Sequence, residues 1–229
     1  MGNNLPLFLD QYEDIIKNNL IFIYNSLANP NEKTLVEYNH LHEIMKYNYL
    51  FVDCSKVFYE ISYDEIVFLS TALKTNTCLV KLDLSQTKLT DDLLIHLIEN
   101  GVKHLLTIQH LNFSHNMITC RGIKHLANFL TYNTKITRLD ISSNRMAADG
   151  MIGLSGMITL NRTLRYLNIF NNKQTKEDNI YFYDRLFKNY SILYFRTNIF
   201  TTKELVVIKK IIERNIALYQ GAFTEIVFT

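Results

Sequence analysis

The sequence has 229 residues, enough for one large domain with a sizeable buried core or for two small domains. Hydrophobic residues make up 48% and charged residues 20%, and both values are ordinary for a folded chain. The 24 Lys and Arg residues nearly balance the 22 Asp and Glu residues, so the formal net charge is only +2. This balance argues against binding to nucleic acid or to an anionic membrane surface, because both favour a strong basic excess.

The cysteines and the N-terminus indicate a reducing compartment. Cys54, Cys78 and Cys120 have no CxxC spacing, and such a sparse, odd set is typical of reduced thiols. The first residues lack the basic and apolar regions of a cleavable secretory signal, and no stretch approaches the roughly 18 apolar residues of a membrane span. We therefore expect a location in the cytoplasm, or secretion without a cleavable signal into the cytosol of a host cell.

Residues 1–48 show no repeat and are predicted to form a helical cap. Apolar residues recur at helical spacing from Leu9 to Leu27, which predicts a first helix. Thr34 and Glu37 have the spacing of a capping box, which predicts the start of a second helix. A cap is expected here because the open end of a repeat array has to be covered.

Residues 49–229 are predicted to form one continuous solenoid. Four segments share the pattern apolar-x-x-apolar-x-apolar, and their first residues are 29, 28 and 28 positions apart. These first residues are Leu79, Ile108, Ile136 and Leu164. Weaker copies at 52–55 and 192–197 flank them, and each of the four segments is followed by a turn. The turns carry a polar residue at a fixed offset: Thr87, Asn116, Asn144 and Asn172.

Helices are predicted after the turns, because apolar residues recur there at helical spacing. An Asn at such a bend can satisfy backbone groups that a tight turn leaves unpaired. Helices end near Asn76, Asn133 and Asn161. At the C-terminus, residues 203–218 are predicted to form a last helix and residues 223–228 a closing strand.

This pattern resembles leucine-rich repeats of the ribonuclease-inhibitor-like class over about residues 49–200. The resemblance implies an α/β fold: a solenoid with a curved parallel sheet on its concave side, helices on its convex side, and here an N-terminal helical cap. Similar solenoids include ribonuclease inhibitor, the sensing regions of innate-immune receptors and the actin-binding end of tropomodulin. Fold analogy does not choose among their partners.

The strand residues that alternate with the apolar ones are predicted to line the concave face. A column of Asp and Asn and a column of Ser are usual in this repeat class, and we interpret them as structural. The remaining outward positions change from basic to aromatic along the chain, and Arg and Tyr are frequent at binding hot spots. The predicted partner-binding residues are Lys81, His110, Arg138, Arg165, Tyr166, Phe170, Tyr194 and Arg196.

No catalytic motif is present: the sequence has no P-loop, no HExxH, no GxSxG and no CxxC pair. We therefore expect no enzymatic activity and no cofactor. His110 and His115 could approach each other across a strand and its turn, but no acid or Cys at ligand spacing completes a metal site. Cys54 occupies an inward strand position, which favours a buried structural thiol over a nucleophile.

The sequence leaves several functional hypotheses open. The leading one is a non-catalytic protein-interaction module that binds an unidentified protein partner. The abundance of Asn, Ile and Tyr is typical of an AT-rich genome, and a small repeat protein with this composition resembles effectors that intracellular bacteria inject to act on a host protein. The same composition also fits an AT-rich protist. The alternative is a GTPase-activating protein resembling the Ran regulator, for which Arg121 and Arg145 are the candidate residues. Self-association through edge strands is a further possibility, and the oligomeric state is not predicted.

Overall fold

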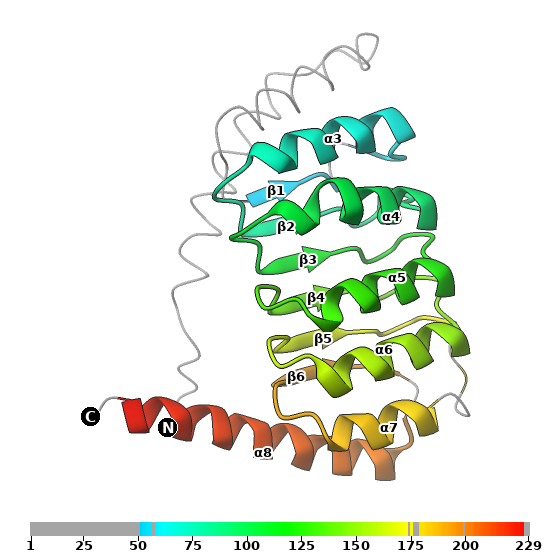
Figure 1. Cartoon of the computed structure of the whole chain (residues 1–229). Coiled ribbons are helices and arrows are strands. Elements are labelled where there is room, and N and C mark those ends of the chain that lie inside the picture. Colours follow the sequence, from blue (N-terminus) through cyan, green and yellow to red (C-terminus); the bar gives the residue numbers. More distant parts are fainter. Residues whose placement is uncertain (1–50, 56–57, 174, 176–178, 199, 227–229) are drawn as a thin grey trace. The chain divides into compact units, whose positions relative to one another are not determined.

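A computed structural model of this chain describes residues 51–55, 58–173, 175, 179–198 and 200–226. All of these residues belong to one compact unit, Met45–Thr229. The predicted cap, residues 1–48, lies outside the described residues. Within the described part, six short strands alternate with six α-helices, as the repeat pattern predicts (Figure 1).

The six strands form one parallel sheet in which every strand lies beside its neighbour in sequence. They are β1 (Phe51–Asp53), β2 (Lys81–Asp83), β3 (His110–Asn112), β4 (Arg138–Asp140), β5 (Tyr166–Asn168) and β6 (Tyr194–Arg196). Consecutive parallel strands need a crossover, and the helix of each repeat supplies it. The fold is therefore an α/β solenoid.

Five helices form a second layer along one face of the sheet, as Figure 1 shows: α3 (Tyr63–Thr75), α4 (Asp91–Asn100), α5 (Cys120–Thr131), α6 (Ala148–Leu160) and α7 (Asn179–Phe187). A short 3₁₀ turn, η1 (Val102–His104), follows α4. The last helix, α8 (Thr202–Ile226), instead runs across the end of the array beyond β6. Consecutive helices pack against each other, so each repeat contacts chiefly its neighbours.

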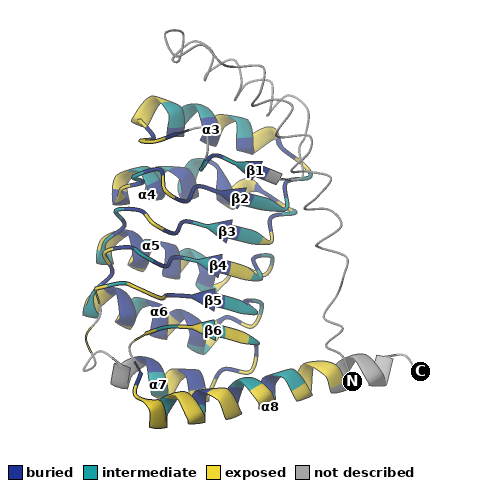
Figure 2. Cartoon of the chain, turned by 180° about the vertical axis from the view of Figure 1, so that it is seen from behind, coloured by how far each residue is buried: buried dark blue, intermediate teal, exposed yellow. Residues whose placement is uncertain are grey.

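The core lies between the two layers, and Figure 2 shows it as a buried stripe that continues from repeat to repeat. The middle residue of each central strand points into it: Leu82, Leu111, Leu139 and Leu167 are at most 2% exposed. Helix residues at three- and four-residue spacing, such as Ile123, Leu126 and Leu130 of α5, close it from the other side. The apolar periodicity of the sequence is thus the periodicity of the core.

A ladder of asparagines stabilises the turns that follow the strands. Asn116 is buried, and its Nδ2 donates to the carbonyls of Leu84 in the preceding repeat and Phe113 in its own, at 2.8 and 3.0 Å. Its Oδ1 accepts from the backbone N–H of Leu89 at 2.9 Å. Asn144 and Asn172 repeat this bridging one and two repeats later. The predicted role of the turn asparagines is therefore confirmed.

A second asparagine ladder stabilises the opposite turns, where helices lead into strands. Asn76, Asn133, Asn161 and Asn189 each accept two backbone N–H bonds from residues two and three positions later. Asn161 and Asn189 also donate to carbonyls of the preceding repeat, Leu130 and Ile158. Both are almost fully buried, so these two side chains serve the fold.

The C-terminus differs from the prediction. Helix α8 begins where predicted but continues to Ile226, so the strand predicted at 223–228 is wrong for residues 223–226; residues 227–229 lie outside the described residues. Phe223 and Ile226 are three positions apart and fit a helical period as well as an alternating one. Adding a residue to an existing helix costs far less than starting a new element, so the helix continues.

Candidate binding surface

The face of the sheet that points away from the helices, called here the concave face, carries the predicted binding residues in registered columns. Backbone pairing places Lys81 beside His110, His110 beside Arg138, Arg138 beside Tyr166, and Tyr166 beside Tyr194. Residues two positions later form the Asp and Asn column, with Asp83, Asn112, Asp140 and Asn168 in register. The alignment of both columns is as the sequence predicts.

Three side chains of the first column stack on one another. The guanidinium of Arg138 lies over the ring of Tyr166, with 4.7 Å between Cζ and the ring centroid. The rings of Tyr166 and Tyr194 are parallel within 2° and their centroids are 4.5 Å apart. Both contacts are favourable beyond simple burial: in the first the cation meets the electron-rich ring face, and in the second two aromatic rings stack on each other. Arg138, Tyr166 and Tyr194, named here the Arg-Tyr stack, span β4 to β6.

A second cation–aromatic pair joins the end of β6 to the turn after β5. The guanidinium of Arg196 on β6 lies over the ring of Phe170, with 4.8 Å between Cζ and the centroid. Phe170 follows β5 and is 36% exposed, a large value for an apolar ring. Tyr194 is 47% exposed, so the last two strands present apolar and cationic surface together.

Arg165 does not join the Arg-Tyr stack, although the sequence grouped it with Arg138 and Arg196. Its Nη1 donates to the carbonyl of Arg162 at 2.7 Å, and its Cζ lies 5.4 Å from the ring centroid of Tyr219 on α8. Arg165 precedes the strand and therefore lies at the edge of the concave face. It connects the last repeats to α8.

The two basic residues at the β2 and β3 end of this column, Lys81 and His110, are less available to bind a partner than the sequence indicates. The Nζ of Lys81 lies 3.7 Å from Oδ2 of Asp83, within ion-pair distance. His110 is half-buried, and burial, with smaller contributions from Arg138 and Lys81, lowers its pKa from 6.5 to about 4. At neutral pH the imidazole is therefore uncharged, and Arg138 is the first free cation of this column.

We expect His110 to make the protein less stable in acid. Because its pKa is lower in the folded chain than in the unfolded chain, the unfolded chain binds the proton more readily. Stability is therefore lost progressively as pH falls from about 6.5 to about 4. Denaturant unfolding at several pH values should show this loss in the wild type and a smaller one in His110→Gln. Equal pH dependence of the two proteins would contradict the assignment.

The Asp and Asn column is committed to internal hydrogen bonds. Asp140 Oδ1 accepts from the N–H and the Oγ of Ser142, at 2.9 and 2.6 Å, and its Oδ2 accepts from Asn168 Nδ2 at 2.7 Å. Asp83 makes the same three bonds with Ser85 and Asn112. These bonds hold the end of each strand to its turn and to the next repeat. They support the structural interpretation of the Asp, Asn and Ser columns.

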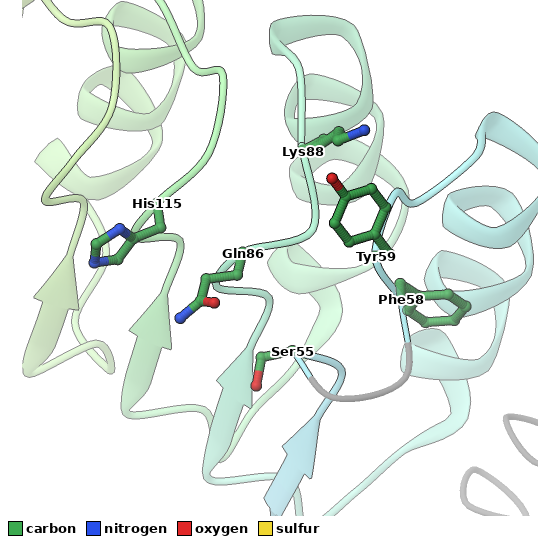
Figure 3. Close-up of a pocket in the computed structure, with 6 residues that line it drawn as sticks. All are labelled: Ser55, Phe58, Tyr59, Gln86, Lys88 and His115. Carbon is green, nitrogen blue, oxygen red and sulfur yellow. The ribbon is translucent and has the colours of Figure 1, made fainter.

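A shallow hollow of about 400 Å³ lies away from the stack, over the turns that follow β1, β2 and β3 (Figure 3). Its lining residues are Ser55, Phe58, Tyr59, Gln86, Lys88 and His115. The Nζ of Lys88 lies 2.8 Å from Glu60 Oε2 and 4.3 Å from the Tyr59 centroid, so the hollow's cation is already paired. No motif in the sequence indicated this hollow.

The remaining residues that the sequence analysis considered for catalysis or metal binding do not form a site in the described part of the chain. Cys54 is buried, and burial, followed by the nearby Asp53, raises the pKa of its thiol, as expected of a structural cysteine. Arg121 lies in the first turn of α5, and its Nη2 lies 2.6 Å from Asp92 Oδ1. Arg145 is exposed in the turn before α6. In the described part of the chain, no three metal-ligating side chains are grouped.

Comparisons with known proteins agree with this architecture. The leucine-rich-repeat family model matches residues 75–92 and 132–155, so the chain contains leucine-rich repeats. No curated protein matches the sequence. Helices long and apolar enough to cross a bilayer are absent from the described residues.

Two solved structures are similar over most of their length. One is actin-binding site 2 of leiomodin-1, at 16% identity and a TM-score of 0.54, covering 82% of this chain and 94% of that one. The other is the C-terminal domain of tropomodulin from Caenorhabditis elegans, at 14% identity and a TM-score of 0.50, covering 82% and 96%. At such low identity the similarity establishes the fold, a leucine-rich-repeat solenoid.

Proposed function

We propose that this chain is a non-catalytic protein-interaction module that binds a macromolecular partner over strands β4 to β6 of its concave face. The observation that carries the proposal is the Arg-Tyr stack, three large side chains held against one another on the sheet, with Arg138 and Tyr194 exposed and Tyr166 half-buried between them. Preordered side chains lose little conformational entropy on binding, and Arg and Tyr are frequent at hot spots. The nearby Arg196–Phe170 pair extends the same surface.

The same proposal includes two further points: the repeats are of the ribonuclease-inhibitor-like class, and the partner is a protein of a host cell. Repeats of 28 and 29 residues support the ribonuclease-inhibitor-like class. The composition supports a role as an effector on a host protein, in the cytoplasm or in a host cytosol. Of the two candidates for the GTPase-activating alternative, Arg121 is already paired with Asp92, which leaves only the exposed Arg145. Actin, for which the similar site of leiomodin-1 is named, is included in the test as a defined probe.

A photo-crosslinking experiment tests the proposed surface. A benzoylphenylalanine residue replaces Tyr194 at the end of the stack or, as a matched control, Tyr132, which is 84% exposed after α5 on the helix side. The two proteins are irradiated with purified actin and, separately, with eukaryotic cell lysate. We expect a discrete adduct from position 194 and none from position 132. Adducts from position 132 alone would place binding on the helix side and overturn the proposal.

Affinity capture with a variant carrying Arg138→Glu, Tyr166→Ala and Tyr194→Ala provides the second measurement. Recovery of the crosslinked partner should fall at least about tenfold, since hot-spot truncations each cost roughly 2 kcal/mol or more. A control variant carries Arg185→Glu, Tyr132→Ala and Leu160→Ala, all exposed outside the sheet. It should recover the partner as the wild type does. Circular dichroism has to show that both variants fold.

A further inference from the structure

The charges on the concave face are divided unequally between its two ends. The described residues of β1 and β2 present Asp53 and Asp83 against Lys81 alone. Strands β4 to β6 and the residue before β5 present Arg138, Arg165 and Arg196 against Asp140 alone. The end that carries the Arg-Tyr stack is therefore electropositive, although the whole chain is nearly neutral.

Among the described residues, the single carboxylate at this end, Asp140, forms no ion pair with the three arginines. Both oxygens of Asp140 are engaged by Ser142 and Asn168 in the turn and in the next strand. In the described part of the chain, neither Arg138 nor Arg196 has a carboxylate within ion-pair distance. Arg165 instead donates to backbone carbonyls. Arg138 and Arg196 are thus exposed cations whose charge is unmet on the folded chain.

The two free guanidinium groups are also held in a defined orientation. Each lies over an aromatic ring, Arg138 over Tyr166 and Arg196 over Phe170, with 4.7 and 4.8 Å between Cζ and the ring centroid. A stacked guanidinium keeps its N–H groups at its edge, where they can donate two parallel hydrogen bonds to a carboxylate. Ordering by the ring means that less side-chain entropy is lost when such an acceptor binds.

We propose that the partner of this surface is an acidic protein segment whose Asp or Glu carboxylates bind the edges of Arg138 and Arg196. This inference rests on the proposed function and names the chemistry of its partner. Apolar groups of the same segment pack on the exposed rings of Tyr194 and Phe170. A nucleic acid fits less well: the neighbouring column carries Asp53, Asp83 and Asp140, and His110 is uncharged, so no continuous basic stripe follows the face.

The first test uses defined probes and charge-matched variants. Fluorescent peptides of ten glutamates and of ten lysines, and a ten-nucleotide oligouridine, are titrated with the protein at low salt. The site variant carries Arg138→Glu and Arg196→Glu. Its control carries Arg185→Glu and Lys210→Glu, which change the net charge equally at exposed positions on α7 and α8. We expect the glutamate peptide to bind the wild type and the control alike, and the site variant at least about tenfold more weakly.

A second variant separates specific recognition from net charge. Arg138→Lys with Arg196→Lys keeps both charges but removes the planar edge, so we expect several-fold weaker binding of the glutamate peptide. If the site variant and its control bind the glutamate peptide equally weakly, or if the lysine variant binds it as the wild type does, the peptide responds only to overall charge. Either result would overturn the proposal. Tighter binding of oligouridine, lost in the site variant, would assign the surface to nucleic acid and overturn it as well.

Failure of this inference differs from failure of the proposed function. If position 194 crosslinks a partner whose recovery is unchanged by Arg138→Lys with Arg196→Lys, the concave face binds a protein, but not through carboxylates. If the glutamate peptide does not bind at millimolar concentration, the acidic class is likewise rejected. If position 194 gives no adduct with actin or lysate, the proposed function itself fails.

Discussion

Replacing Asn116 with alanine is expected to destabilise the protein by about 3–5 kcal/mol, a large part of the stability of an ordinary domain. The side chain is buried and bridges two repeats. It donates to the carbonyls of Leu84 and Phe113 and accepts from the N–H groups of Thr87 and Leu89. Alanine would leave several of these backbone groups buried without a partner, and each such group costs about 1–3 kcal/mol.

The effect should extend beyond one turn, because a solenoid is stabilised by contacts between neighbouring repeats. Asn116 joins the turn after β2 to the turn after β3, so its loss weakens the interface between these repeats. We therefore expect the denaturant transition to move to lower concentration and to broaden, as the two ends of the array unfold less cooperatively.

Asn128→Ala is the matched control for this prediction. Asn128 is exposed on α5, so the same chemical change should alter stability by less than about 0.5 kcal/mol. Equilibrium unfolding in urea, followed by circular dichroism, measures both variants. A loss below about 1 kcal/mol in Asn116→Ala would show that water or relaxed backbone satisfies these groups, and that the ladder is not a main source of stability.

Much of the fold follows from the sequence because one periodicity determines both layers. The inward residues Leu82, Leu111, Leu139 and Leu167 are identified by the repeat alone, and parallel pairing then fixes which outward residues are neighbours. The column that contains Arg138, Tyr166 and Tyr194 can thus be aligned from the repeat pattern. A register error of one residue would have turned every one of these side chains into the core.

The side-chain contacts on that surface could not be read from the repeat. In the sequence, Arg138 and Arg165 are both basic residues next to the apolar positions of a repeat. In the structure, Arg138 lies over the ring of Tyr166, whereas Arg165 donates to a backbone carbonyl and lies over the ring of Tyr219. The difference arises because Arg165 lies before its strand, next to a helix that belongs to no repeat. Contacts made with α8 depend on where that helix docks, and a repeat pattern carries no information about its last neighbour.

The turn after β2 shows a related limit. Thr87 occupies the ladder position, and its Oγ1 donates to the carbonyl of Leu84 in its own turn and to Asn116 Oδ1 of the next repeat, at 2.9 and 3.3 Å. Lys88 beside it adopts a φ of 54°, a left-handed conformation that the corresponding residues Met117 and Arg145 do not adopt. The sequence shows that threonine replaces asparagine at position 87, but it does not show the left-handed backbone conformation of Lys88 that accompanies this replacement.

Helix α8 ends the second asparagine ladder, and this leads to the other large expected effect. Asn215 is fully buried, and its Nδ2 donates to the carbonyls of Asn189 and Ile192, at 3.2 and 2.8 Å. It thereby takes the place that the asparagine of a following repeat would occupy. Its neighbour Arg214 donates to the carbonyls of Phe187 and Asn189. A polar side chain on the buried face of α8 thus closes the open end of the array.

Asn215→Leu is expected to cost about 2–3 kcal/mol, because leucine has a similar volume but leaves the Ile192 carbonyl buried without a donor. The loss should be local first: α8 is held mainly by Ile208, Ile211 and this amide, so it should separate from the last repeat before the others unfold. Hydrogen exchange of the α8 amides should therefore accelerate at least about tenfold, while exchange in α5 and α6 changes little.

Glu213→Leu provides the control, since it introduces the same side chain two positions away at an exposed site. Its ion pair with Lys209, at 3.9 Å, is exposed and contributes little, so exchange in α8 should remain at the wild-type rate. Uniform acceleration across α5, α6 and α8 in Asn215→Leu would contradict local separation. It would mean instead that the last repeats and α8 unfold as one unit, with Asn215 part of the cooperative core and the surface over β4 to β6 dependent on it.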